Sequence, residues 1–186
     1  SGVNRGSDLS RRKAPRVCAT ISGVMATRNT YTTLTITTHA PEETVQLGER
    51  LGAHLRSGDV LCLSGALGAG KTALTRGLAR GWGALERPTS PTFTLINEYR
   101  RAGDSERFYH VDAYRLSGAV EAMTTGIEDV LDAPGVVVIE WPERIEPALP
   151  DERLWIDIEA TGDEERRFTL RAEGARAEAL VAALGG

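Results

Sequence analysis

Short apolar runs alternate along this chain with segments whose apolar residues have helical spacing. Val60–Leu63 and Val136–Ile139 are continuously apolar, which is typical of parallel strands buried on both faces of a sheet. Leucines spaced four residues apart between residues 47 and 55 line one face of a predicted helix, and Pro41 suits its first turn. These patterns indicate an α/β protein.

The same patterns predict the remaining elements. Leu154–Glu159 and Arg167–Arg171 alternate apolar and polar residues and can pair as an antiparallel hairpin. Thr124-Thr125-Gly126 interrupts one of the predicted helices. Further strands are expected at Tyr31–Thr38 (an edge strand), Thr92–Tyr99 and Phe108–Val111, and further helices at Ala73–Trp82, Ala119–Leu131 and Ala175–Leu184. This order predicts a mainly parallel sheet with helices on both faces and a C-terminal antiparallel hairpin.

The first 30 residues differ from the rest of the chain in charge. They carry six basic residues and one acid, a net charge of +5, so the rest of the chain carries −9 of the total of −4. Because residues 1–30 lack periodicity, we expect a disordered basic extension, followed by one domain over residues 31–186. Such tails can be organellar transit peptides or nucleic-acid arms, but a solvated extension without a specific role is favoured. The acidic body is poorly suited to binding RNA unaided.

The composition limits which cellular compartment and which kinds of cysteine site are expected. No apolar run approaches the roughly 20 residues that span a bilayer. Cys18 and Cys62 have neither the spacing of metal ligands nor that of a disulfide framework. Cys62 lies in an apolar run and is expected to be a buried thiol, and this cysteine usage fits a reducing cytoplasm.

A phosphate-binding motif follows the first buried strand. Eight residues match the G-x-x-x-x-G-K-[ST] pattern of a P-loop, between an apolar strand and a helix as that motif requires. Lys71 is expected to reach the β- and γ-phosphates, and the Thr72 hydroxyl to ligate Mg²⁺. Backbone N–H groups and the helix N-terminus favour phosphate oxygens. We therefore expect ATP and Mg²⁺ to bind at Gly65, Ala66, Leu67, Gly68, Ala69, Gly70, Lys71, Thr72 and Ala73.

Lysine usage supports this prediction. The chain has 20 arginines but only two lysines, and the only lysine of the body is Lys71. A planar, bulky guanidinium would not replace a compact ammonium in a P-loop. The guanine-reading motif Asn-Lys-x-Asp needs a lysine of its own and is absent, so ATP is expected rather than GTP.

A P-loop enzyme also needs an acid that holds Mg²⁺ or orders the attacking water. Glu140 ends the second buried strand, and Asp112 ends the strand predicted before it, at the sheet edge where ligands of open α/β sheets bind. Either acid can take this role. His110 stands two residues before Asp112 on the same strand face. A local supporting role in the site and plain packing are equally possible interpretations of this histidine. Trp141 directly follows Glu140, at the rim of the same site.

Four motifs in order carry a resemblance to a known family: the P-loop within LSGALGAGKTALTRGLARGWG, then SPTFTL, HVDAYRL and IEWPER. Over about residues 38–160 the chain resembles the bacterial TsaE (YjeE) family, the small P-loop ATPases of tRNA threonylcarbamoyladenosine synthesis. The resemblance implies the partners TsaD and TsaB, with tRNA reached only through that complex. TsaD attaches the threonylcarbamoyl group, and ATP turnover is implied to reset the complex between rounds.

The resemblance also implies roles for single residues. Lys71 and Thr72 take the P-loop roles, and Glu140 becomes the carboxylate on the Mg²⁺ side. Asp112 and Trp141 fall on positions needed for hydrolysis, with Asp112 also a candidate on the metal side.

Two further regions receive weaker assignments from the resemblance. The segment from Ser90 to Thr94 corresponds to a switch-like region near the γ-phosphate, so Ser90 and Thr92 join the candidate nucleotide contacts. A strand-entry turn is the alternative for that segment. Thr44 occupies a position near the adenine, and the first 30 residues depart from the family, so no function transfers to them.

The expected activity is ATP hydrolysis, slow in isolation because no internal arginine finger is obvious. Two alternatives remain open. One is a small-molecule kinase, for which only Arg100-Arg101 hints at a basic lid. The other is a nucleotide-sensing binding subunit whose hydrolysis is incidental.

Overall fold

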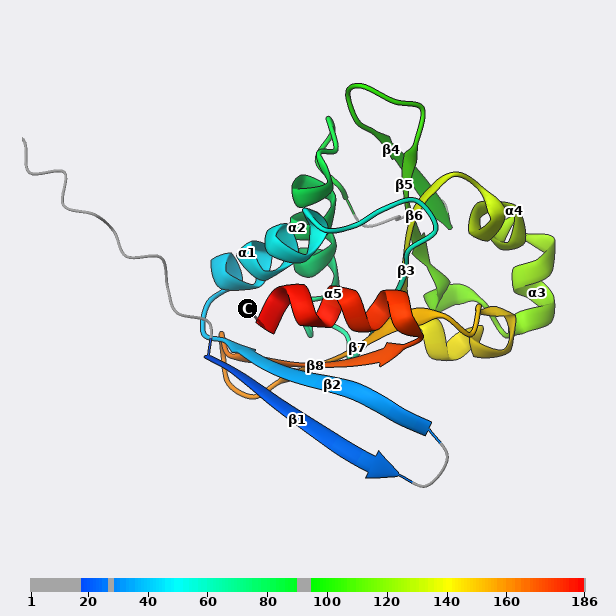
Figure 1. Ribbon diagram of the computed structural model, residues 1–186. Coiled ribbons are helices and arrows are strands. Elements are labelled where there is room, and N and C mark those ends of the chain that lie inside the picture. The colour runs from blue at the N-terminus through cyan, green and yellow to red at the C-terminus, as the bar shows by residue number, and fades with distance from the viewer. Residues whose placement is uncertain (1–17, 27–28, 90–94, 186) are drawn as a thin grey trace, which may run out of the picture.

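The computed structural model describes residues 18–26, 29–89 and 95–185 (Figure 1). Strands and helices alternate through most of this length. In chain order they are β1 (Cys18–Ala26), β2 (Asn29–Thr38), α1 (Pro41–Gly52), β3 (Val60–Ser64), α2 (Lys71–Trp82), β4 (Ile96–Arg100), β5 (Arg107–Asp112), η1 (Ala113–Arg115), α3 (Ala119–Thr124), α4 (Ile127–Asp132), β6 (Gly135–Glu140), η2 (Pro142–Arg144), η3 (Glu146–Ala148), β7 (Arg153–Ala160), β8 (Arg166–Glu173) and α5 (Ala175–Gly185).

The described strands form one sheet of eight in the order β1-β2-β8-β7-β3-β6-β5-β4. The four central strands β7, β3, β6 and β5 are parallel, whereas β1, β2 and β8 on one side and β4 on the other pair antiparallel. The sheet is therefore mixed, with parallel pairing confined to its centre. The loop between β7 and β8 is too short for a crossover, which needs a dozen residues or more.

Helices cover both faces of the central strands, as the sequence predicts (Figure 1). In β3, Leu61 and Leu63 join the core under α1, α2 and α5, whereas Val60 and Cys62 join the core under α3 and α4. Because both faces are buried, β3 has no polar face, and the same holds for β6. In β8 only one face is buried, and its residues alternate accordingly.

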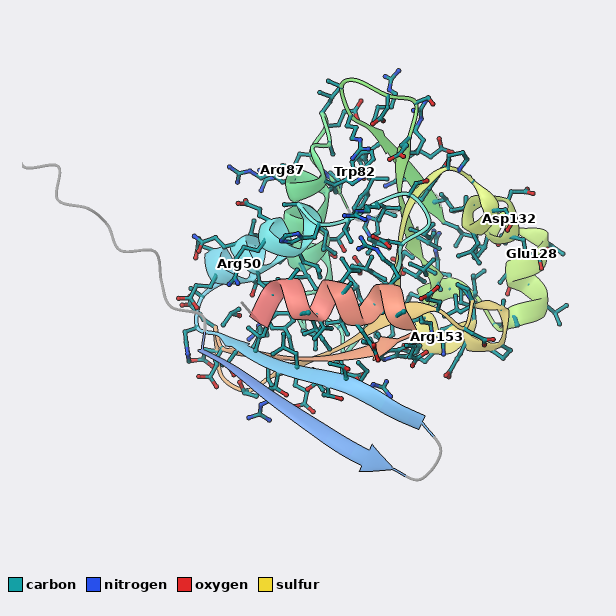
Figure 2. The ribbon with its side chains drawn as sticks, viewed as in Figure 1. Arg50, Trp82, Arg87, Glu128, Asp132 and Arg153 are labelled. Carbon is teal, nitrogen blue, oxygen red and sulfur yellow. The ribbon has the colours of Figure 1, made fainter. Side chains whose placement is uncertain are left out.

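Helices α1 and α2 pack with almost no side chains between them. Gly48 and Gly52 of α1 face Gly77 and Gly81 of α2, and a Cβ added at any of the four would lie closer than 3.0 Å to backbone atoms of the other helix. Arg50, which is labelled on α1 in Figure 2, donates from Nη2 to the carbonyl of Leu184 in α5 at 3.0 Å. The three helices on this face are thus joined directly.

The structure differs from the sequence prediction at the start of the chain. Cys18–Ala26 forms β1 and pairs antiparallel along β2, so the expectation of disorder does not hold for these nine residues. As a result β2 lies inside the sheet and not at its edge. Pairing with the open side of β2 satisfies the backbone groups of a segment that lacks a periodic pattern of its own.

Two other boundaries shift. The helix predicted over residues 119–131 is two short helices, because Gly126 adopts a left-handed conformation (φ 82°) between them. Strand β4 begins at Ile96, and residues 92–94 of the strand predicted there lie outside the described residues. The helices of the described residues include none that is long and apolar enough to cross a membrane.

Candidate nucleotide-binding site

The P-loop connects the end of β3 to the start of α2. Gly70 has φ 112°, a left-handed conformation that glycine adopts readily, and the helix begins at the next residue, Lys71. Gly65 packs closely against the backbone of Ile158 in β7, where a side chain would clash. Leu67, at the tip of the loop, is exposed. The loop therefore presents its backbone at the carboxyl edge of the parallel strands.

Lys71 points back into the loop that precedes it. Its Nζ donates to the carbonyl oxygens of Gly65 at 2.5 Å and Ala66 at 3.0 Å, and lies 3.8 Å from the centre of the Trp141 ring. Burial lowers the pKa of Lys71 below the usual lysine value, and nearby carboxylates, Glu140 foremost, oppose this shift. The site thus holds a desolvated ammonium surrounded by carbonyls, carboxylates and an aromatic face.

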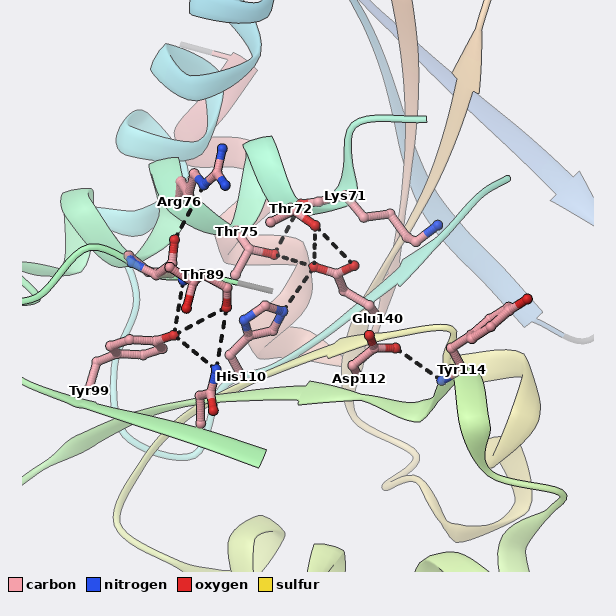
Figure 3. Close-up of polar contacts among 12 residues, drawn as sticks. Lys71, Thr72, Thr75, Arg76, Thr89, Tyr99, His110, Asp112, Tyr114 and Glu140 are labelled. Carbon is pink, nitrogen blue, oxygen red and sulfur yellow. Dashed lines mark hydrogen bonds and ion pairs between the residues drawn. The ribbon is translucent and has the colours of Figure 1, made fainter. Parts of the chain in front are cut away.

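Glu140, at the end of β6, is the centre of the polar network (Figure 3). Its carboxylate accepts from the Thr72 hydroxyl at 3.3 and 3.4 Å and from the Thr75 hydroxyl at 3.4 Å. The nearest group is Nε2 of His110, at 2.9 Å from Oε1. Glu140 is only 5% exposed, so these contacts replace water around a buried charge.

Asp112 lies beside Glu140, since the two residues are paired in register on β5 and β6. Its Oδ1 accepts from the backbone N–H of Tyr114 at 3.0 Å, which caps the short helix η1. Asp112 is half-buried. The structure therefore brings both predicted acids to one edge of the sheet and gives Asp112 a local structural contact as well.

Trp141 follows Glu140 in a strained conformation. Its φ of 61° is the only positive value for a non-glycine residue in the described ranges. Such a conformation costs about 1–3 kcal/mol and often marks a functional site. The indole packs against Tyr114, with ring centres 5.0 Å apart, and covers Nζ of Lys71. The strained turn thus aims an aromatic face at the P-loop lysine.

Thr44, a further predicted contact, has its hydrogen bond outside this cluster. Thr44 is buried in α1, and its hydroxyl lies 2.9 Å from that of Thr38, within hydrogen-bonding distance. Ser90 and Thr92 lie outside the described residues. Next to that segment, the carbonyl of Thr89 accepts from Asn97 and Tyr99, each at 3.4 Å.

Sequence reasoning missed two neighbours of the site. Thr75 lies one helical turn after Lys71, and its hydroxyl also donates to the Lys71 carbonyl at 3.0 Å. Its position three residues after Thr72, on the same face of α2, is a signal that could have found it. Arg166 at the start of β8 lies beside Gly70, where an added Cβ would be 4.0 Å from Nε. No sequence pattern connects Arg166 with Gly70.

The donors and acceptors fit a phosphate and a hard cation. Loop N–H groups and the Lys71 ammonium suit phosphate oxygens, and the Thr72 hydroxyl and Glu140 carboxylate are oxygen ligands of the kind Mg²⁺ prefers. In the described ranges no three His, Cys, Asp or Glu side chains group as a metal site. Magnesium usually binds through one or two carboxylates together with substrate phosphates, so the residues present are sufficient.

This fold and this site place the chain in the P-loop class of α/β proteins. The model of the family described as threonylcarbamoyl adenosine biosynthesis protein TsaE matches residues 38–168. The chain belongs to the TsaE family, and the resemblance found in its motifs is confirmed.

Individual relatives agree with this assignment. The tRNA threonylcarbamoyladenosine biosynthesis protein TsaE of Bacillus subtilis is 43% identical over 140 residues, which cover 75% of this chain and 86% of that protein. The protein of the same description from Streptomyces coelicolor is 44% identical over 146 residues, covering 76% and 99%. The crystal structure of Bacillus subtilis YdiB has a TM-score of 0.69 and 39% identity, covering 83% of this chain and 95% of that one.

Proposed function

We propose that the protein hydrolyses ATP in the synthesis of threonylcarbamoyladenosine in tRNA. The observation that carries this proposal is the contact of the Glu140 carboxylate with the Thr72 hydroxyl, beside Lys71 and in register with Asp112. Family membership and the names of the relatives supply the process. The geometry supports ATP hydrolysis as the reaction, because a phosphate cradle flanked by two strand-end acids suits phosphoryl transfer to water.

Different residues of the chain take different parts in binding and hydrolysing ATP. The P-loop N–H groups and the N-terminus of α2 hold the phosphates, and Lys71 exchanges the carbonyls of Gly65 and Ala66 for phosphate oxygens. Thr72 and Glu140 would hold Mg²⁺, which supplies charge neutralisation at the β- and γ-phosphates when bound. Asp112 orients the attacking water from the neighbouring strand.

Trp141 acts on Lys71 in this proposal. Its ring face stabilises the ammonium in a buried site by a cation–π contact and excludes water from one side of it. Tyr114 packs on the same indole, and its backbone N–H donates a hydrogen bond to Asp112. The lysine and the water-orienting acid therefore share one structural support.

The partners and the compartment follow from the process. We assign TsaD and TsaB as the partners and place the protein in the cytoplasm, with tRNA contacted through the complex. Pull-down with TsaD and TsaB, with and without ATP, tests this assignment. Association should depend on nucleotide, and its absence under both conditions would refute the partners without touching ATP hydrolysis.

Two variants test the hydrolytic site. Lys71→Ala removes a charge-assisted contact and should weaken ATP binding by about 10–100-fold, measured by calorimetry. Glu140→Gln keeps the size of the side chain and should bind ATP while hydrolysis in the presence of the partners falls about a hundredfold or more. If Glu140→Gln supported full tRNA modification, hydrolysis would be incidental and the proposal wrong.

The test of Asp112 needs a matched pair of variants, because this residue also caps η1. Asp112→Asn keeps an acceptor for the Tyr114 N–H but removes the charge, whereas Asp112→Ala removes both. We expect each to bind ATP normally and to lose about 10²–10⁴-fold in hydrolysis rate. If Asp112→Asn hydrolysed ATP at the parent rate while Asp112→Ala was slow, Asp112 would have only its capping role.

A further inference from the structure

His110 is a buried side chain in direct contact with the central carboxylate of the site. It lies in β5 and is fully buried, and its Nε2 is 2.9 Å from Oε1 of Glu140 (Figure 3). This distance is shorter than the contacts of Glu140 with Thr72 or Thr75, which lie between 3.3 and 3.4 Å. Among the observed partners of Glu140, His110 therefore holds the carboxylate most closely.

The other ring nitrogen of His110, Nδ1, indicates which nitrogen carries the proton. Nδ1 of His110 is buried and has no hydrogen-bond partner within the described ranges. A proton on Nδ1 would be a buried donor without an acceptor, which is unfavourable. A carboxylate only accepts hydrogen bonds, so the proton lies on Nε2 and is donated to Glu140. Nε2 of His110 is thus the donor to Glu140.

We propose that His110 is a positioning residue for Glu140, acting on magnesium binding and not on ATP itself. By fixing Oε1, it orients the carboxylate so that its other oxygen is available to the cation or to water bound to it. The Thr72 hydroxyl has one proton and two lone pairs, so it can donate to Glu140 and still offer a lone pair to the cation. This inference rests on the proposed function.

A histidine suits this position better than a longer cationic side chain. An arginine or lysine beside Glu140 would neutralise the carboxylate that the cation needs and would itself require desolvation. Partners that orient metal-binding carboxylates from behind commonly change metal affinity 10–100-fold when removed.

Two amide variants separate positioning from packing. His110→Gln keeps an N–H that extends toward Glu140, whereas His110→Asn buries the same amide group but is too short to reach it. His54→Gln, at an exposed position, is the control. Binding of a non-hydrolysable ATP analogue is followed by calorimetry as Mg²⁺ is added, and once in EDTA.

We expect His110→Asn to raise the half-saturating Mg²⁺ concentration about 10–100-fold, with affinity in EDTA unchanged within about twofold. His110→Gln should fall between Asn and the parent, and His54→Gln should match the parent. In a Glu140→Gln background, His110→Asn should cause no further change, because it acts through that carboxylate.

A parent-like Mg²⁺ dependence in both amide variants would overturn the inference, and so would an undiminished effect in the Glu140→Gln background. If His110→Asn does not fold, His110→Leu, which fills the site but cannot donate, takes its place: a rise of about threefold or more in the half-saturating Mg²⁺ concentration supports positioning, and a smaller change overturns it. A parent chain that bound no ATP analogue would defeat the proposed function instead, so the two failures are distinguishable.

Discussion

Lys71 keeps its positive charge in a place that disfavours it. The side chain is 5% exposed, and burial is the main reason that its pKa lies below the usual lysine value. The carbonyls of the loop and the Trp141 ring compensate in part for the lost water. Phosphate would compensate far better, so binding should favour the charged form.

This argument predicts an alkaline limit to ATP binding. As the pH rises through the lowered pKa of Lys71, the free site loses its proton, whereas the ATP-bound site must regain it. ATP affinity should therefore fall by up to about tenfold per pH unit, starting at a lower pH than for an ordinary lysine. Calorimetry between pH 7 and 10 measures this. Lys71→Met should bind weakly with no such slope, and the same slope in that variant would contradict the argument.

The Cys62 thiol gives a second prediction for a single side chain. Burial in β3 raises its pKa to about 12, so very little thiolate is present near neutral pH. In a Cys18→Ser variant, Cys62 should react with a disulfide reagent at pH 8 at least about a hundredfold more slowly than in urea-unfolded protein. Absorbance of the released thiol follows the reaction. Equal rates would mean that β3 opens readily in the native state.

At the scale of elements, the contact between α1 and α2 determines where the P-loop stands. Helix α2 begins at Lys71, and its far side packs on α1 through glycines with no intervening side chains. Backbone contact of this kind allows little sliding or rotation. The two helices therefore act as one support behind the loop.

A single methyl group should disturb this support. Gly77→Ala favours the isolated helix by about 1 kcal/mol, but its Cβ would collide with the Val45 carbonyl and the Gly48 Cα. We expect a net loss of about 1–3 kcal/mol in the free energy of unfolding, measured in urea. Gly118→Ala is the comparison, because its Cβ would meet no atom within 4 Å; since Gly118 is the N-cap of α3, where alanine is poorer than glycine, the loss should be about 1 kcal/mol at most.

Most elements were predictable from local pattern, and the exceptions have physical reasons. Strands buried on both faces, such as β3 and β6, have unmistakable apolar runs. β1 has no such pattern and is held by backbone pairing with β2, the next strand, which apolar periodicity does not indicate. The P-loop and its acids follow from motif and strand order. The position of Arg166 beside Gly70 depends on the β7–β8 hairpin and has no local signal.

For the whole molecule, the nucleotide site lies on the central parallel strands, whereas β1 lies at the far edge of the sheet. Three strands, β2, β8 and β7, separate β1 from the P-loop strand β3. The family match begins at residue 38, after both β1 and most of β2. β1 and the candidate site therefore have no direct contact through the sheet.

Removal of residues 1–26 should leave nucleotide binding intact. We expect the shortened chain to bind ATP with a dissociation constant within about twofold of the parent, measured by calorimetry, because β2 keeps its pairing with β8. Stability in urea is the companion measurement, since β2 then becomes an edge strand. A large loss of ATP affinity in a folded, shortened chain would show that β1 supports the site.

The glycine contact between α1 and α2 also has a genetic consequence. Every single-nucleotide missense change in a glycine codon introduces a side chain, and at Gly48, Gly52, Gly77 and Gly81 even the smallest one meets backbone. No conservative replacement exists at these four codons. In a saturation-mutagenesis screen they should be as intolerant as Lys71, although none of them belongs to the P-loop. A map of sensitive codons would therefore trace the helix contact as clearly as the P-loop.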